Sequence, residues 1–177
     1  RVIGWDVRHV HALATLLPSV ADPARRAALE QGLERLAGLW PRIGQLRTQV
    51  LHNDFSLSNL VVDHAHPAFV TGVIDFGDAV RTAVAIDVST ALLNQLRVAD
   101  LEDEELALIP HLTMARVIAR ALITTERARL FPQNATYISR NTEPGWGQLA
   151  WFLARPVDAI SGLLAEGRAT TNRRLDR

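Results

Sequence analysis

Two short polar motifs border one predicted β-hairpin, and this arrangement constrains the fold of the chain more than any other feature. Residues 51–60 read LHNDFSLSNL and lead into a short β-branched run, Leu60–Val62. A turn at 63–67 follows, and a second predicted strand, 69–75, runs into the motif IDFGD. Because the arms of a hairpin pair antiparallel, its two outer ends lie together. The polar groups of the two motifs are therefore expected to lie side by side.

Asp54 is the first candidate catalytic residue. A carboxylate on such a loop orients a hydroxyl nucleophile and accepts its proton, and in phosphoryl transfer the positioning matters more than the proton removal. The alternative interpretation is that Asp54 caps its own turn, as aspartates in Asx turns do. The presence of Asn59 and Asp75 at the other positions of the two motifs favours the catalytic interpretation.

Asn59 and Asp75 are the candidate magnesium ligands. Asn59 offers a neutral amide oxygen and Asp75 a charged one, and Mg²⁺ prefers a few such protein oxygens combined with phosphate oxygens and water. The alternative is structural, with Asn59 as a turn residue and Asp75 as a cap at the strand end. The spacing D-x-x-x-x-N alone is weakly specific, whereas its combination with the later IDFGD is strongly specific.

Four further polar residues are placed around these three. His52 is a candidate catalytic residue, and we favour a role in supporting the loop by packing and hydrogen bonding over a role as base, since it lies two residues before Asp54. Ser56 and Asp78 are placed beside the substrate, and for Asp78 contact with metal, substrate or backbone are equal alternatives. Asp87 lies in an apolar segment, where an unpaired carboxylate is costly. Its expected partner is a backbone amide of the Asp54 loop, and the alternative is an arginine.

Two further groups of residues have a substrate-binding interpretation and a structural one. The aromatic residues Trp146, Trp151 and Phe152 form either an aromatic wall for a cationic substrate or part of the core. The acidic run 102–105 suits the start of a helix, where it either attracts an amine or forms a solvated face. The structural interpretation is the more frequent one in both cases.

The order H-x-D-x-x-x-x-N followed by D-F-G, filled here by His52, Asp54, Asn59 and residues 75–77, resembles that of the protein kinases. The whole chain resembles the C-terminal lobe of the aminoglycoside phosphotransferase and choline kinase-like superfamily. The triplet 52–54, His-Asn-Asp, is similar to that of choline and ethanolamine kinases, while many aminoglycoside enzymes have glycine in the middle. Three other segments resemble those of hydroxylysine kinase-like proteins. They are GVIDFGD at 72–78 with Asp87 in the next helix, WDVR at 5–8, and the loop with Asn134, Tyr137 and Trp146.

This resemblance implies an α+β, predominantly helical fold: residues 1–177 form the C-terminal catalytic lobe of a small-molecule kinase that uses ATP and Mg²⁺. It implies that Asp54 is the catalytic aspartate and that Asn59 and Asp75 hold the magnesium ion and its nucleotide. The expected reaction is phosphorylation of the hydroxyl of a small amine-containing metabolite such as hydroxylysine or an amino alcohol. The alternatives are an aminoglycoside-type antibiotic phosphotransferase and a catalytically silent lobe that serves as a binding or fusion domain.

The composition of the chain limits which domains, nucleic acids and membranes it is expected to contact. All 19 basic residues are arginine, and no glycine-rich phosphate loop is present. We therefore expect the nucleotide-binding N-terminal lobe, or a fused domain, to lie outside this chain. The net charge of zero without a basic stripe argues against nucleic acid. The absence of an uninterrupted apolar run of about 20 residues argues against a membrane span. The absence of cysteine favours a cytoplasmic location.

The remaining chain is expected to be mostly helical. Helices are predicted within residues 1–20 and over 23–40, 84–93, 106–129, 149–153 and 157–164. In the second of these, Asp22 is the expected N-cap and Pro41 the expected terminator. The segment 106–129 is expected to form one or two helices, with Pro110 near a start. Residues 132–147 are predicted to form an irregular loop. Leu96-Arg97 lacks a turn residue where a helix should end, which is compatible with an omitted loop.

Overall fold

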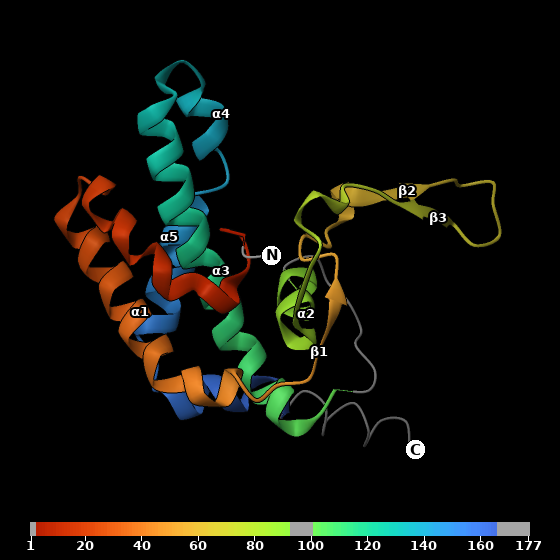
Figure 1. Ribbon diagram of the computed structural model, residues 1–177, viewed down its shortest axis with the longest axis horizontal. Helices are drawn as coiled ribbons and strands as arrows, with labels where there is room; N and C mark the ends of the chain where they lie inside the picture. Colours follow the sequence, from red (N-terminus) through yellow and green to blue (C-terminus); the bar gives the residue numbers. More distant parts are fainter. Residues whose placement is uncertain (1–2, 93–100, 166–177) are drawn as a thin grey trace.

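The computed structural model describes residues 3–92 and 101–165, which form a mostly helical body with a projecting β-hairpin (Figure 1). Helix α3 (Asp103–Leu130) runs through the middle of the body. The other helical segments pack around it: the 3₁₀ helix η1 (Val7–Ser19), α1 (Pro23–Ile43), α2 (Val84–Leu92), α4 (Ala135–Ser139) and α5 (Glu143–Leu153). Residues 157–165 are also helical, as predicted. The predicted predominance of helix over strand is confirmed.

Helix α1 begins as predicted and ends later than predicted. The carboxylate of Asp22 accepts hydrogen bonds from the backbone N–H groups of Ala24 and Arg25, and Pro23 occupies the first helical position. The expectation that Pro41 ends the helix is wrong, because α1 continues to Ile43. The last turn closes through the N–H of Gly44, which donates to the carbonyl of Trp40. A proline this close to the end therefore leaves the final helical turn intact.

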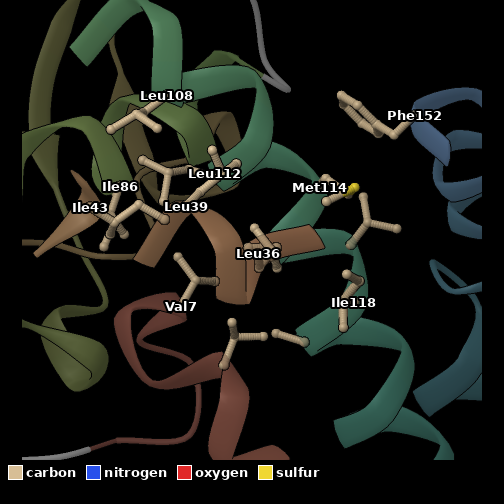
Figure 2. Close-up of a cluster of buried hydrophobic side chains, with 14 of the residues drawn as sticks. Val7, Leu36, Leu39, Ile43, Ile86, Leu108, Leu112, Met114, Ile118 and Phe152 are labelled. Atoms are coloured by element: carbon tan, nitrogen blue, oxygen red, sulfur yellow. The ribbon is translucent and has the colours of Figure 1, made fainter. Parts of the chain in front are cut away.

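The hydrophobic core lies between α3 and the helices that cover it (Figure 2). Its largest side chains include Leu36 and Ile43 of α1, Ile86 of α2, and Leu112 and Ile118 of α3, all at most 2% exposed. Gly32 marks the closest approach of α1 to α3, since a Cβ atom at this position would lie 2.6 Å from Cδ1 of Ile118. The core fixes α3 against the segments that carry the polar motifs.

The strands form two separate two-stranded antiparallel sheets. Strand β2 (Leu60–Val62) pairs with β3 (Val70–Val73), which confirms the predicted hairpin, and this hairpin projects away from the helices in Figure 1. Strand β1 (Thr48–Leu51) pairs with β4 (Val80–Ala83), a pairing that the sequence did not predict. Because β1 precedes the first motif and β4 follows the second, this pairing closes the opposite end of the two motif loops.

Three other expectations need correction or lie outside the described residues. The segment predicted as one or two helices is the single helix α3, and Pro110 lies in its interior. The segment 132–147 is not irregular: it contains a 3₁₀ turn, α4 and the start of α5. Prolines at the first turns of helices are well tolerated, so Pro132 and Pro144 begin helices here instead of breaking them. The Leu96-Arg97 passage lies outside the described residues.

Helix α3 is the one helix of the described residues whose length and apolar composition suffice to cross a bilayer. However, 78% of its most apolar stretch is buried inside the protein. This is the environment of a core helix, and Figure 1 shows the helices that cover it.

Candidate active site

His52 links the two motif loops through both of its ring nitrogens. Nε2 lies 2.8 Å from the backbone carbonyl oxygen of Ile74, and Nδ1 lies 3.3 Å from the backbone N of Asp54. Because a carbonyl can only accept and an N–H can only donate, the neutral ring carries its proton on Nε2. The ring also packs against Phe76, with 4.8 Å between the ring centroids. His52 thus supports the loop, and both of its nitrogens already have hydrogen-bond partners.

Asn59 holds Asp54 in place. Its Nδ2 donates to the backbone carbonyl of Asp54 at 2.8 Å and to the carboxylate Oδ2 at 3.1 Å. Both partners are acceptors, so the orientation of the amide is fixed with Oδ1 of Asn59 on the other side. Oδ1 of Asp54 makes no hydrogen bond within the described ranges, which leaves it available to a hydroxyl.

Asp75 lies across the hairpin from Asn59. Leu60 pairs with Val73, and the N–H of Ile74 donates to the carbonyl of Asn59 at 2.9 Å. Asp75 therefore directly follows the residue that is bonded to Asn59. It adopts the left-handed conformation, with φ of 64°, and its side chain is exposed. The backbone pairing of the hairpin thus brings the stretch that contains Asn59 beside Asp75.

The side chains present fit a magnesium–nucleotide complex better than a metal held by protein alone. No group of three or more His, Cys, Asp or Glu side chains in the described segments is arranged around a common metal position. Asn59 Oδ1 and the Asp75 carboxylate offer one neutral and one charged oxygen from opposite arms of the hairpin. Mg²⁺ favours this kind of partial ligand set, which phosphate oxygens and water complete.

Arg116 of α3 anchors the same loop from behind, and sequence reasoning missed it. Its guanidinium donates to the backbone carbonyls of Trp5 and Asn53, each at 2.8 Å, and to Oγ1 of Thr90 at 2.7 Å. The side chain is 4% exposed. Burial lowers the pKa of the guanidinium, an effect that the carboxylate of Asp54 opposes most strongly. The sequence gives no local signal for this role, because α3 also contains Arg120, Arg127 and Arg129.

Asp87 of α2 lies beside the loop that carries Asp54. Burial raises the pKa of its carboxyl group, and the backbone N–H groups of Asn53 and Phe55 act in the opposite direction. The charge of Arg116 also lowers this pKa, so the alternative partner, an arginine, contributes through its charge. Asp87 therefore places its carboxyl group next to the backbone of Asn53 and Phe55 from the side of α2.

The backbone conformation of Asn53 restricts which residue types fit the middle position of the triplet 52–54. Its backbone adopts the left-handed conformation with φ of 63°, which glycine and asparagine accept most readily. The side chain is fully buried, and its Oδ1 lies 3.4 Å from the guanidinium of Arg116. An asparagine here combines the required turn with a contact to α3.

A cavity of about 290 Å³ opens beside Asp54. It is lined by Trp5, Asp54, Asp78, Thr90, Arg116 and Arg120. Asp78 thus lines this cavity, whereas Ser56 does not line it, and its hydroxyl oxygen lies 2.7 Å from that of Ser58.

The surface groups with two interpretations have structural roles. Phe152 lies in the core, Trp146 and Trp151 stack against Arg25 and Arg155, and none of these aromatic residues lines the cavity. Glu102 and Glu105 form a capping box at the start of α3. The side chain of Glu105 is fully buried and pairs with Arg47 at 2.8 Å, so the acidic run is not simply a solvated face.

Comparison with known proteins agrees with this geometry. The model of the phosphotransferase enzyme family matches residues 4–152, which include every candidate site residue. The chain belongs to this family. No curated protein and no solved structure matches it significantly. Membership of the phosphotransferase family supports a kinase-type enzyme, and it leaves the acceptor to be inferred from the site.

Proposed function

We propose that this protein transfers the γ-phosphoryl group of ATP to the hydroxyl of a small, amine-containing metabolite. The observation that carries the proposal is the arrangement of Asp54, with its free Oδ1, beside the amide of Asn59 and across the hairpin from Asp75. Family membership supports the transfer of phosphate. The cavity next to Asp54 supports a small acceptor, since its volume is about 290 Å³.

In the proposed reaction the acceptor lies in the cavity with its hydroxyl against Oδ1 of Asp54. The hydroxyl oxygen forms a bond to the γ-phosphorus while the bond from that phosphorus to the bridging oxygen of ADP breaks, and the proton passes to Asp54. The carboxylate mainly orients the nucleophile, because the transition state of phosphoryl transfer is loose. Asn59 and Asp75 would hold the magnesium ion, which supplies charge neutralisation on the phosphates when bound.

The first test replaces the two carboxylates separately in the full-length protein. Asp54→Ala and Asp75→Ala should each reduce ATP-dependent phosphorylation more than a thousandfold, while circular dichroism and thermal unfolding stay close to those of the wild type. His64→Ala, at the exposed tip of the hairpin, is the control and should retain activity. Full turnover by either aspartate variant would refute the assignment.

The acceptor is identified by measuring ATP consumption against hydroxylysine, choline, homoserine and a set of aminoglycosides. An amine-bearing metabolite as the best acceptor supports the proposal. Preference for an aminoglycoside would change the substrate class and leave the chemistry unchanged.

The alternative function is a silent lobe that acts only in binding. Magnesium-dependent nucleotide binding separates the two, because a silent lobe would show no such dependence. The free Oδ1 of Asp54 favours the active enzyme, since it leaves a carboxylate oxygen at the cavity for an acceptor hydroxyl.

A further inference from the structure

The cavity beside Asp54 lies on one side of the candidate reacting groups. Its lining comes from α3, α2 and the segments that contain Trp5 and Asp78, and it does not include Asn59 or Asp75. The proposed metal ligands are therefore outside this cavity, which makes it the acceptor side of the site. Two of its lining residues, Arg116 and Arg120, lie one helical turn apart on α3.

These two arginines differ in how their guanidinium groups are used. Arg116 is almost fully buried and donates to two backbone carbonyls and a hydroxyl, so it is part of the structure. The side chain of Arg120 is half-buried and makes no hydrogen bond or ion pair with any residue of 3–92 or 101–165. Burial lowers the pKa of its guanidinium, and the charge of Asp54 acts in the opposite direction.

The guanidinium of Arg120 therefore faces the cavity beside Asp54 with its five N–H donors available to a bound ligand. We propose that Arg120 binds a carboxylate of the acceptor, so that the substrate is a hydroxy acid, with its hydroxyl at Asp54 and its carboxylate at Arg120. This inference rests on the proposed function. A planar carboxylate matches the fork of a guanidinium with two parallel hydrogen bonds.

The charges of the cavity favour a single negative charge over a phosphate dianion. Two carboxylates, Asp54 and Asp78, and two guanidinium groups, Arg116 and Arg120, face the same space. A dianion would meet repulsion from both aspartates, while a carboxylate next to an ammonium group would leave the cavity close to neutral. A hydroxylated amino acid combines these two groups with the hydroxyl that the reaction requires.

The test compares acceptors that differ only in the carboxylate. The pairs are hydroxylysine with 1,5-diaminopentan-2-ol, and homoserine with 3-aminopropan-1-ol. In the pair that the full-length wild type phosphorylates, the compound with the carboxylate should have a kcat/KM at least tenfold higher than the compound without it. Arg120→Gln should reduce this ratio at least tenfold, as expected for the loss of a charge-assisted hydrogen bond. Arg120→Lys, which keeps the charge, should retain part of the preference.

Arg127→Gln is the matched control, because Arg127 is exposed on the same helix and does not line the cavity. It should leave the preference unchanged, and both glutamine variants should unfold close to the wild-type temperature. The inference is overturned if the wild type uses acid and decarboxylated amine equally. It is also overturned if Arg120→Gln lowers kcat/KM equally for both members of a pair, which is the result expected if Arg120 were only a counter-ion of Asp54. A variant whose only defect is a higher KM for ATP would overturn it as well. Absence of phosphorylation of any acceptor would instead refute the proposed function itself.

Discussion

The imidazole of His52 donates from Nε2 to the backbone carbonyl of Ile74 at 2.8 Å, and so joins the loop of Asp54 to the strand end that carries Asp75. The same ring accepts the N–H of Asp54 on Nδ1. One neutral side chain thereby sets the relative position of two candidate reacting groups from opposite sides of the hairpin.

The substitution His52→Ala should lower kcat about tenfold to a hundredfold, which is less than the loss expected for Asp54→Ala. Removal of the ring deletes both hydrogen bonds and the contact with Phe76, so the two loops lose their alignment. The free energy of unfolding should fall by about 1–3 kcal/mol. Steady-state kinetics and denaturant titration measure the two effects, with His64→Ala as the control. A loss of activity equal to that of Asp54→Ala would indicate that His52 itself takes part in proton transfer.

The hairpin and its polar residues could be predicted from the sequence because they depend on local signals. Turn residues, a β-branched run and fixed offsets place Asp54, Asn59 and Asp75 without knowledge of the rest of the chain. The helix 84–92 was equally predictable from its largely apolar sequence. By contrast, Pro41 and Pro132 misled the prediction, because a proline ends or begins a helix according to its place in the turn.

The substitution Arg116→Met should be among the most destabilising in the chain. It leaves the carbonyls of Trp5 and Asn53 without this donor in a buried position and removes a positive charge that interacts with Asp54. The free energy of unfolding should fall by about 3–5 kcal/mol. Chemical denaturation measures this change. Arg127→Met, exposed on the same helix, should stay within about 0.5 kcal/mol of the wild type. Equal stability of the two variants would show that Arg116 does not anchor the loop.

The cavity could not be predicted from the sequence because it depends on how α3 is rotated against the loops. Arg116 and Arg120 are more than 50 positions beyond Asn59, and nothing local distinguishes them from the exposed Arg127. Only packing shows that the first is structural, the second faces the cavity and the third is exposed to solvent.

The substitution Asn59→Asp should harm the enzyme although it adds a carboxylate to the proposed metal site. The new carboxylate would place an acceptor oxygen where Nδ2 now donates to the carbonyl and Oδ2 of Asp54, so attraction becomes repulsion. We expect kcat to fall at least tenfold and the activity to recover partly at lower pH, where the pair shares a proton. A pH–rate profile at saturating Mg²⁺ measures this. An activity equal to the wild type at all pH values would contradict the observed orientation of the Asn59 amide.

His111 should make the stability of the protein depend on pH well away from the active site. The ring is fully buried in α3, with Nε2 2.9 Å from the hydroxyl of Ser161. Burial, reinforced by the charges of Arg35 and Arg42, lowers its pKa from 6.5 to about 4. Between these two values the unfolded chain binds a proton that the folded protein does not, so the free energy of unfolding falls as the pH decreases through this window.

The full effect of this linkage amounts to about 3 kcal/mol between pH 6.5 and pH 4. The variant His111→Gln, which keeps a hydrogen-bonding group for Ser161 and does not titrate, should lack this part of the pH dependence. Urea denaturation of both proteins at a series of pH values measures the difference, in which the contributions of the carboxylates cancel. His64→Gln, at an exposed position, should follow the wild type. Parallel stability curves for the wild type and His111→Gln would mean that the buried ring accepts a proton without cost.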